Sequence, residues 1–285
     1  MKMSCELINK IGAHYKAFTK TEKKVADYIM ENPREVLYLS ISDLAERCGV
    51  GDTTVFRFCR TLDLGGYQEF KMNLAQSISS EANIIASAKS IRLQDTVPEV
   101  CSKLLTMEQE VLQATHQMLK AEDISKAVGM LEKASRICFF GFGASGVTAL
   151  AAKNRFLRVI PYVFYEQDSH TQSMAAALMK PGELAVFITY SGTTKDMLDV
   201  AKSCRRAGAS SICITRYTKS PITELADVIL LCGANEGPMQ GGAMATMISQ
   251  LYLVDILYTE YYRRNFERCV ENRRLAVESI SGKLL

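Results

Sequence analysis

The hydrophobic pattern of the chain changes near residue 135, and this change limits the possible fold more than any other feature. Before it, apolar residues recur at helical spacing, and no strand-like run interrupts the first 78 residues. After it, short apolar runs alternate with segments long enough for helices, at residues 137–140, 162–165, 184–189, 211–215 and 228–231. Strands that are apolar throughout are typical of a parallel sheet with helices on both faces. We therefore predict an α-helical N-terminal region followed by an α/β domain with a five-stranded parallel sheet.

The N-terminal region contains two short helical segments separated by a glycine-rich turn. Residues 41–48 carry apolar positions at helical spacing, and Ser42 is a suitable N-cap. Gly49-Val50-Gly51 then makes a tight connection, after which Asp52 can cap a second helix over residues 53–62. Two short helices across such a turn are typical of the helix-turn-helix motif.

The second helix of this pair has one apolar and one polar face. An arginine pair on a short helix is by itself most often a solvated surface, but Arg57 and Arg60 occupy the DNA-reading position of the motif. We therefore expect both arginines to contact guanine edges or phosphates, with hydroxyl and aromatic neighbours meeting phosphates or thymine methyls. The predicted DNA-binding set is Ser42, Thr53, Thr54, Phe56, Arg57, Arg60 and Lys71, of which Lys71 could also be plain surface.

Two predicted strands are followed by loops rich in glycine and hydroxyl residues. Gly143-Ala144-Ser145-Gly146 follows the first strand, and Ser191-Gly192-Thr193-Thr194 follows the third. Ligands of such sheets bind outside the carboxyl ends of the strands, and helix N-termini attract anions because their N–H groups are unpaired. Ordinary helix capping needs one hydroxyl of the second loop, and the other two exceed that need. We therefore predict a phosphate site that both loops form.

The composition argues against metal, cofactor and membrane functions. The nine cysteines contain no C-x-x-C pair and the three histidines have no ligand-like spacing, so we expect neither a metal site nor a cofactor. No uncharged apolar run reaches about eighteen residues, and the N-terminus lacks the apolar core of a signal peptide, so we expect a cytoplasmic protein. The net charge of +3 permits nucleic-acid binding without arguing for it.

Two sets of motifs resemble a known combination of domains. Residues 39–70, with Ser-Ile-Ser-Asp-Leu-Ala-Glu, Thr-Thr-Val-Phe-Arg-Phe-Cys-Arg and Gly-Tyr-Gln-Glu-Phe-Lys, resemble the N-terminal domain of RpiR-type bacterial transcription regulators. Residues 141–258, with Gly-Phe-Gly-Ala-Ser, Asp-Ser-His, Thr-Tyr-Ser-Gly-Thr-Thr and Ser-Pro-Ile-Thr-Glu-Leu-Ala-Asp, resemble a sugar isomerase (SIS) domain. The resemblance implies a homodimer or homotetramer that binds operator DNA and senses a phosphorylated sugar.

The pattern and the resemblance together divide the chain into four parts. We predict a helix-turn-helix domain at residues 1–78, a helical linker at 79–120, a phosphosugar-binding SIS domain at 121–262 and a C-terminal helical tail at 263–285. The tail interleaves arginines with apolar residues, and glutamates at helical spacing offset the arginines. We interpret it as a surface or dimer-packing helix.

The resemblance also implies which residues meet the effector. By their position in the motifs, Ser145, Ser191 and Thr194 would contact the phosphate or its neighbouring hydroxyls. His170 follows the second predicted strand, and Glu236 lies where SIS domains often place a carboxylate near the sugar. The predicted effector-binding set is Gly143, Ala144, Ser145, His170, Thr189, Tyr190, Ser191, Gly192, Thr193, Thr194 and Glu236.

The chain departs from the usual family pattern at three places. Members commonly have serine where this chain has Gly51, and Asp52 can replace the lost cap. They have glycine where this chain has Asp63, but aspartate tolerates a left-handed backbone better than most residues. Thr246-Met247 stands where the family often has Ser-Arg, so the sugar preference stays open.

An enzymatic alternative also stays open. In a phosphosugar isomerase, Glu236 or His170 would shuttle a proton between adjacent sugar carbons, and the N-terminal helices would be an assembly module. Neither residue has sequence neighbours that assign it this role. We therefore predict a transcription regulator rather than an enzyme.

Overall fold

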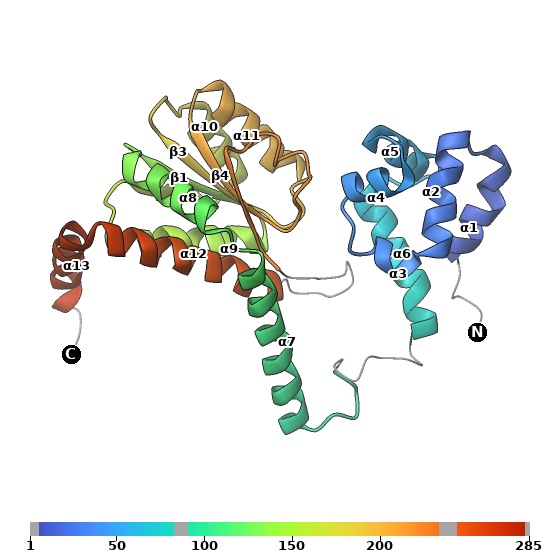
Figure 1. Ribbon diagram of the computed structural model, residues 1–285, viewed down its shortest axis with the longest axis horizontal. Helices are drawn as coiled ribbons and strands as arrows, with labels where there is room; N and C mark the ends of the chain where they lie inside the picture. Colours follow the sequence, from blue (N-terminus) through green and yellow to red (C-terminus); the bar gives the residue numbers. More distant parts are fainter. Residues whose placement is uncertain (1–5, 83–90, 234–243, 283–285) are drawn as a thin grey trace. The chain divides into compact units, whose positions relative to one another are not determined.

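The computed structural model describes residues 6–82, 91–233 and 244–282, which belong to two compact units (Figure 1). The first unit ends at Gln109 and the second begins at Glu110, within helix α7 (Val97–Gln117). Among the described residues, no helix combines the length and apolar character needed to span a bilayer.

The first unit is helical, as its sequence predicts. Phe18, Phe58 and Phe70 lie at the centre of its core, with ring centroids 5.0 Å apart for the first pair and 5.9 Å for the second. Apolar residues at helical spacing produce this core, because each helix turns one stripe inward. Its helices are α1 (Glu6–His14), η1 (Tyr15–Ala17), α2 (Lys20–Glu31), α3 (Pro33–Val36), α4 (Ile41–Cys48), α5 (Asp52–Thr61) and α6 (Tyr67–Ala82).

The second unit contains the predicted five-stranded parallel sheet. The strands lie in the order β2-β1-β3-β4-β5, and every neighbouring pair is parallel. The strands are β1 (Ile137–Gly141), β2 (Val163–Tyr165), β3 (Leu184–Ile188), β4 (Ser210–Thr215) and β5 (Val228–Leu231). The helices are α8 (Ala121–Lys133), α9 (Ala144–Phe156), α10 (Ser169–Ala177), α11 (Lys195–Arg206), α12 (Met244–Arg264) and α13 (Phe266–Ser281).

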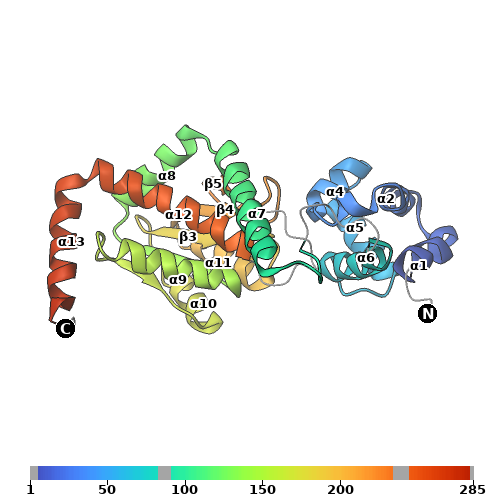
Figure 2. The same cartoon turned by 90° about the horizontal axis from the view of Figure 1, so that it is seen from below.

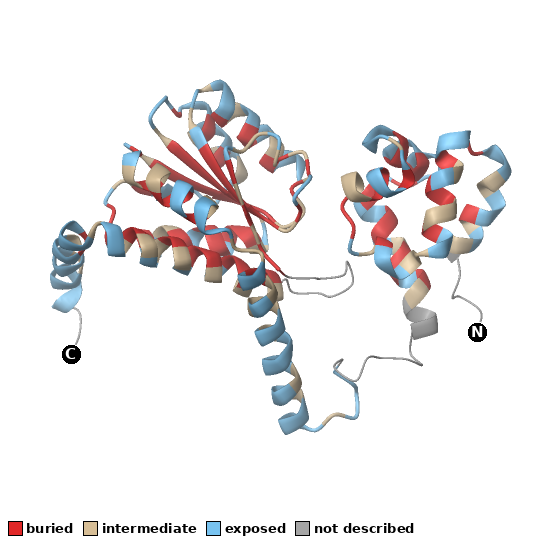
Figure 3. Cartoon of the chain, in the orientation of Figure 1, coloured by how far each residue is buried: buried red, intermediate tan, exposed pale blue. Residues whose placement is uncertain are grey.

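Helices cover both faces of this sheet, which explains why its strands are apolar throughout. Alternate residues of β1 belong to two hydrophobic cores, one on each face of the sheet. Ile137 and Phe139 face α8, α9 and α12, whereas Cys138 and Phe140 face α10 and α11. Figure 2 shows α12 beside α9, with which it packs. All five residues of β1 and of β3 are buried, as the red strands in Figure 3 show.

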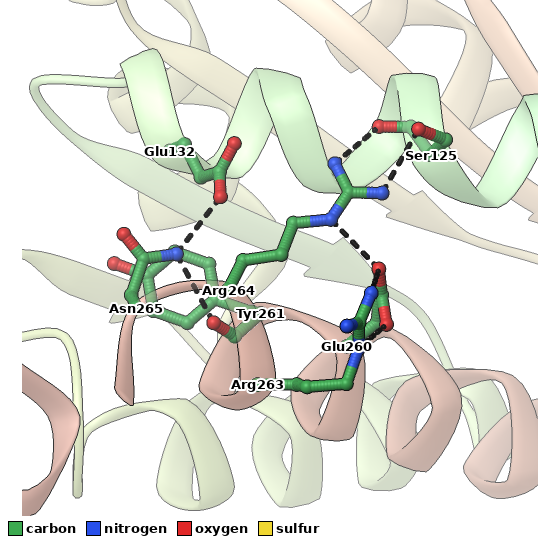
Figure 4. A network of polar contacts seen from close by, with 7 residues as sticks. All are labelled: Ser125, Glu132, Glu260, Tyr261, Arg263, Arg264 and Asn265. Carbon is green, nitrogen blue, oxygen red and sulfur yellow. Dashed lines mark hydrogen bonds and ion pairs between the residues drawn. The ribbon is translucent and has the colours of Figure 1, made fainter. Parts of the chain in front are cut away.

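The end of α12 is bound to α8 by a polar network (Figure 4). Arg264 donates from Nη2 to Ser125 Oγ over 2.9 Å and from Nε to Glu260 Oε1 over 2.7 Å. Asn265 donates from Nδ2 to Glu132 Oε1 over 2.9 Å. Hydrogen bonds from the neighbouring arginines lower the pKa of Glu260 to about 2, so this carboxylate stays charged. The network fixes α12 on the same face of the sheet as α8.

Candidate functional site

The helix-turn-helix pair forms at the predicted place, with a different cap. Ser40, not Ser42, is the N-cap of α4, and it forms a capping box with Asp43. The segment Ser-Ile-Ser-Asp contains two serines, but only Ser40 lies three residues before Asp43. This spacing lets each side chain accept a hydrogen bond from the backbone N–H of the other residue. Ser42 instead donates from Oγ to Asp52 Oδ2 over 2.6 Å. Asp52 is the first residue of α5 and forms no cap bond, so both predicted caps were wrong.

The turn between α4 and α5 depends on one left-handed residue. Gly49 has φ 62° and ends α4, and the N–H of Val50 donates to the carbonyl of Ala45 over 2.9 Å. This is the usual glycine ending of a helix, in which a left-handed residue lets the chain reverse direction. The turn places α5 against α4 and α2.

Helix α5 presents an exposed polar face, which we call the recognition face and define as Thr53, Phe56, Arg57 and Arg60. All four are exposed, and Phe56 keeps 45% of its surface in solvent although it is aromatic. Their spacing of three, four and seven residues places them on one side of the helix. Neither Arg57 nor Arg60 lies within ion-pair distance of an acidic group among the described residues, although hydrogen bonds and, to a lesser extent, the charge of Arg57 lower the pKa of Glu22. Both guanidinium groups are therefore available to a partner.

Two predicted DNA contacts are buried instead. Thr54 is 8% exposed, because α5 turns it toward the core beside Val55. Lys71 is 5% exposed; its Nζ donates to the carbonyl of Leu39 over 3.3 Å and lies 5.2 Å from the centre of the Tyr67 ring. Burial lowers the pKa of Lys71 to about 8. We therefore remove Thr54 and Lys71 from the proposed set of DNA contacts.

The residue that ends α5 adopts the conformation that the sequence predicts. Asp63 has φ 57° and is the one non-glycine residue with positive φ in the described ranges. Lys10 Nζ lies 3.3 Å from its carboxylate and donates to the carbonyl of Leu62 over 2.6 Å. The left-handed backbone is therefore present without a glycine.

The two hydroxyl-rich loops leave the sheet from neighbouring strands. Gly141 at the end of β1 lies opposite Ile188 at the end of β3 in the parallel register. We call residues 142–145 the β1 loop and residues 189–194 the β3 loop. Because β2 lies on one side of β1 and β3 lies on the other, the order of the strands in the sheet reverses between β1 and β3. Ligands of α/β sheets bind at such switch points.

The β3 loop has hydroxyl groups but no side-chain cap. Thr194 is the N-cap residue of α11, yet its side chain accepts no hydrogen bond from the first turn. Ser191 Oγ accepts from the backbone N–H of Thr193 over 3.3 Å and from its hydroxyl over 2.9 Å. Ordinary capping therefore does not explain the hydroxyls, and α11 directs the positive end of its dipole toward this loop.

Gly192 is packed too closely for any side chain. Its φ is 66°, and a Cβ atom would lie 2.3 Å from Ser220 Oγ and 2.8 Å from a methyl carbon of Ile222. Ser220 is 4% exposed, and its hydroxyl has no hydrogen-bond partner among the described residues. Ser220 begins the Ser-Pro-Ile-Thr-Glu-Leu-Ala-Asp motif, but it was not among the predicted effector residues, because a serine before proline looks like an ordinary turn residue.

The end of β1 and the β1 loop are held by two buried glutamines that sequence reasoning also missed. Gln172 on α10 donates from Nε2 to the carbonyl of Gly141 over 2.9 Å and accepts from its N–H over 3.2 Å. Gln250 on α12 donates from Nε2 to Ser145 Oγ over 3.3 Å. Both glutamines are 0% exposed. A lone polar residue in a helix usually faces water, so the pattern carries no signal for this role.

Of the remaining predicted effector residues, Thr189, Tyr190, Gly143 and Ala144 lie in these loops, and His170 follows β2. Thr189 is buried and continues β3, donating its N–H to the carbonyl of Ile214 over 3.0 Å. The ring of Tyr190 packs edge-on to the ring of Tyr217, with centroids 5.9 Å apart. Gly143 has φ 57° and precedes Ala144, where α9 begins, and His170 is exposed in the first turn of α10. Glu236 lies outside the described residues.

Comparison with known proteins identifies both regions. Residues 5–81 match the family model described as a helix-turn-helix domain of the rpiR family, and residues 130–260 match the SIS domain. An uncharacterized HTH-type transcriptional regulator of Caldanaerobacter subterraneus is 37% identical, with 85% of each chain covered. The HTH-type transcriptional regulator HexR of Pseudomonas aeruginosa is 34% identical, covering 89% of this chain and 88% of its own.

A solved structure is similar over nearly the whole chain. The NanR protein of Vibrio vulnificus complexed with ManNAc-6P superposes with a TM-score of 0.87 at 25% identity. The match covers 98% of this chain and 99% of NanR. Both units therefore have counterparts, in the same order, within one known protein.

Proposed function

The chain belongs to the rpiR family of HTH-type transcriptional regulators, and we propose that its α/β unit binds a phosphorylated sugar that alters the affinity of its helix-turn-helix unit for operator DNA. One observation carries this proposal: hydroxyl-rich loops flank the β1/β3 switch point in a chain that also presents an exposed basic helix face. The similarity to NanR, which was solved with ManNAc-6P, supports a sugar phosphate as the ligand class.

The recognition face is the proposed DNA contact. Helix α5 would lie in the major groove, where Arg57 and Arg60 reach guanine edges or phosphates. Thr53 would meet a phosphate and Phe56 a thymine methyl group. Ser42, through its bond with Asp52, supports the start of α5 instead of contacting DNA directly.

The two loops are the proposed phosphate site. The uncapped first turn of α11 offers backbone N–H groups, and Ser145, Ser191 and Thr194 offer hydroxyls. Tyr190 and Thr189 line the same edge of the sheet, where a sugar ring attached to the phosphate would lie. Close packing of Gly192 against Ser220 keeps the loop in one conformation.

The chain is proposed to sense the sugar without converting it. Isomerisation needs an acid or base held in position, and the ring of His170 forms no hydrogen bond within the described part of the chain. An exposed imidazole of this kind suits ligand contact better than proton transfer. Glu236, the other candidate base, lies outside the described residues.

The proposed regulator is a homodimer or homotetramer that acts in the cytoplasm. A two-fold symmetric assembly would present two copies of α5 to the DNA. The operator would then be a palindrome whose half-sites lie about one helical turn, or a multiple of one, apart.

The test measures DNA binding and turnover with the same purified chain. Its own upstream DNA, carrying a fluorophore, is titrated at low salt with and without ManNAc-6P, fructose 6-phosphate or ribose 5-phosphate. We expect one of these sugars to change the DNA affinity by about 5- to 150-fold. Steady conversion of an aldose phosphate to a ketose phosphate would contradict the sensing-only proposal. Failure to bind DNA would instead indicate a sugar-phosphate module that acts through another protein.

A further inference from the structure

A buried hydrogen-bond chain joins the β1 loop to helix α12. Gln250 on α12 and Thr148 on α9 are both 0% exposed, and Ser145 is 8% exposed. Gln250 Nε2 lies 3.3 Å from Ser145 Oγ, and Gln250 Oε1 lies 3.1 Å from Thr148 Oγ1. The three side chains therefore form a continuous hydrogen-bonded series away from water, with Ser145 of the β1 loop at one end.

The chemistry of these groups fixes which one donates in each hydrogen bond, and donation runs in the direction from Thr148 to Ser145. The Oε1 atom of Gln250 has no hydrogen and can only accept, so the hydroxyl of Thr148 donates to it. The Nε2 atom of Gln250 can only donate, so Ser145 Oγ accepts from it. A serine hydroxyl has a single hydrogen, and that hydrogen stays available when the oxygen accepts.

The hydrogen of Ser145 has no acceptor in the described part of the protein. The side chain lies in the first turn of α9, two residues after Gly143, whose φ is 57°, at the β1/β3 switch point. We infer that Gln250 is a positioning residue of the effector site: it fixes Ser145 as a hydrogen-bond donor, so the site takes a ligand group with bare acceptor oxygens, such as a phosphate. This inference rests on the proposed function.

A purely structural role for Gln250 is the competing explanation. The neighbouring buried residues of α12 include Leu253 and Val254, so an apolar side chain of similar length would fill this position. Burying an amide costs free energy unless both ends find partners. Here both ends do, and one partner is Ser145, which the proposed function assigns to the phosphate.

The experiment is a double-mutant cycle on sugar-phosphate affinity. Full-length wild type is titrated calorimetrically with ManNAc-6P and fructose 6-phosphate, and the tighter ligand is used for the variants. They are Gln250→Met, Ser145→Ala and the double variant; Gln250→Met keeps the length and removes both hydrogen bonds. Ser249→Ala is the matched control, because Ser249 is also 0% exposed on α12 but bonds to the carbonyl of Thr246.

We expect Gln250→Met and Ser145→Ala each to weaken binding by about 10-fold or more, as loss of a hydrogen bond to a charged group does. The double variant should bind no more weakly than Ser145→Ala, because Gln250 acts through that hydroxyl. The control should bind like wild type. Retained affinity in Gln250→Met, or additive losses in the double variant, would overturn the inference while leaving the proposed function intact.

A second variant covers the case in which Gln250→Met does not fold. Thr148→Val removes the bond that orients the Gln250 amide and leaves the bond to Ser145 possible. We expect a smaller loss, about 2- to 5-fold, that also disappears in the Ser145→Ala background. An additive loss there would overturn the inference. If wild type binds neither sugar phosphate, the proposed function and this inference both fail.

Discussion

On helix α5, the recognition face projects its side chains from a helix into solvent, whereas the β1 and β3 loops are rich in glycines and short hydroxyl residues, of which Ser145 and Gly192 are buried and Thr194 is exposed. Arg57 and Arg60 are exposed and add nothing to the core. Gly192, by contrast, leaves no space for a Cβ, and Ser145 is tied to a buried glutamine. The difference teaches that the two sites should respond differently to mutation. Substitutions on α5 should change binding alone, and substitutions in the loops should change binding and stability together.

The largest expected effect is on DNA affinity. Replacing Arg57 and Arg60 together with alanine should weaken operator binding on the order of 100-fold or more, because each arginine contact is worth about 1–3 kcal/mol. The melting temperature and the sugar-phosphate affinity should not change. Fluorescence anisotropy and calorimetry measure the three quantities. As a control, Arg34→Ala on α3 removes one exposed charge outside the recognition face, and this variant should lose far less operator affinity. Equal losses for both would show that only net charge matters.

The second effect tests the close packing of the β3 loop. Gly192→Ala should abolish sugar-phosphate binding and lower the free energy of unfolding by about 1–3 kcal/mol, because it combines strain at positive φ with a clash against Ser220. Gly129→Ala is the matched control, since Gly129 lies inside α8 with nothing within 4 Å of its added Cβ. The free energy of unfolding of that variant should rise by about 0.5–1 kcal/mol, and its ligand affinity should not change. Chemical unfolding measures the stability of both variants, and calorimetry measures their sugar-phosphate affinity. A Gly192→Ala variant that is as stable as wild type and still binds would contradict the proposed role of close packing in this loop.

The third effect concerns the pH dependence of the helix-turn-helix unit. The pKa of Lys71 is about 8 in the folded chain, below its ordinary value of 10.5. The unfolded chain therefore binds more protons between these values, and stability should rise as the pH increases from 8 to about 10.5. The gain should be about 3 kcal/mol, from a pKa difference of about 2.5 at about 1.36 kcal/mol per unit, and it should be absent in Lys71→Met. Urea unfolding across this pH range measures it; the same slope in the variant would assign the effect to other groups.

The smallest effect is at the end of α5. Asp63→Gly should stabilise the chain by less than about 1 kcal/mol, because glycine adopts φ near 57° without strain. Loss of the exposed contact with Lys10 offsets part of this gain. DNA affinity should stay unchanged. Destabilisation by more than about 1 kcal/mol in thermal unfolding would show that the Lys10 contact outweighs the backbone strain.

The fold could be predicted because its signals are local. Apolar runs such as 184–189 and the glycine turn at Gly49 depend on neighbours within a few residues, so periodicity locates them. Thr54 and Lys71 were misplaced for the opposite reason. Both lie on helices with polar neighbours in sequence, and only the packing of α5 and α6 in three dimensions decides that they are buried.

The same distinction applies to the effector site. The hydroxyl-rich loops follow their strands in sequence, so their position at the sheet edge could be derived. Gln172 reaches the end of β1 from a helix position 31 residues away, and Gln250 reaches the β1 loop from one 105 residues away. No short motif connects residues so far apart. The residues proposed to bind the effector are therefore visible in the sequence, while those that hold them in place become visible only in the structure.

Reciprocal titration tests the central claim most directly. Operator affinity is measured with and without saturating sugar phosphate, and sugar-phosphate affinity is measured with and without saturating operator. Linkage requires the two affinities to change by the same factor, which we expect to lie at about 5- to 150-fold. If both ligands bind and neither changes the affinity of the other, the two units work independently, and the chain is not the sugar-controlled regulator that we propose.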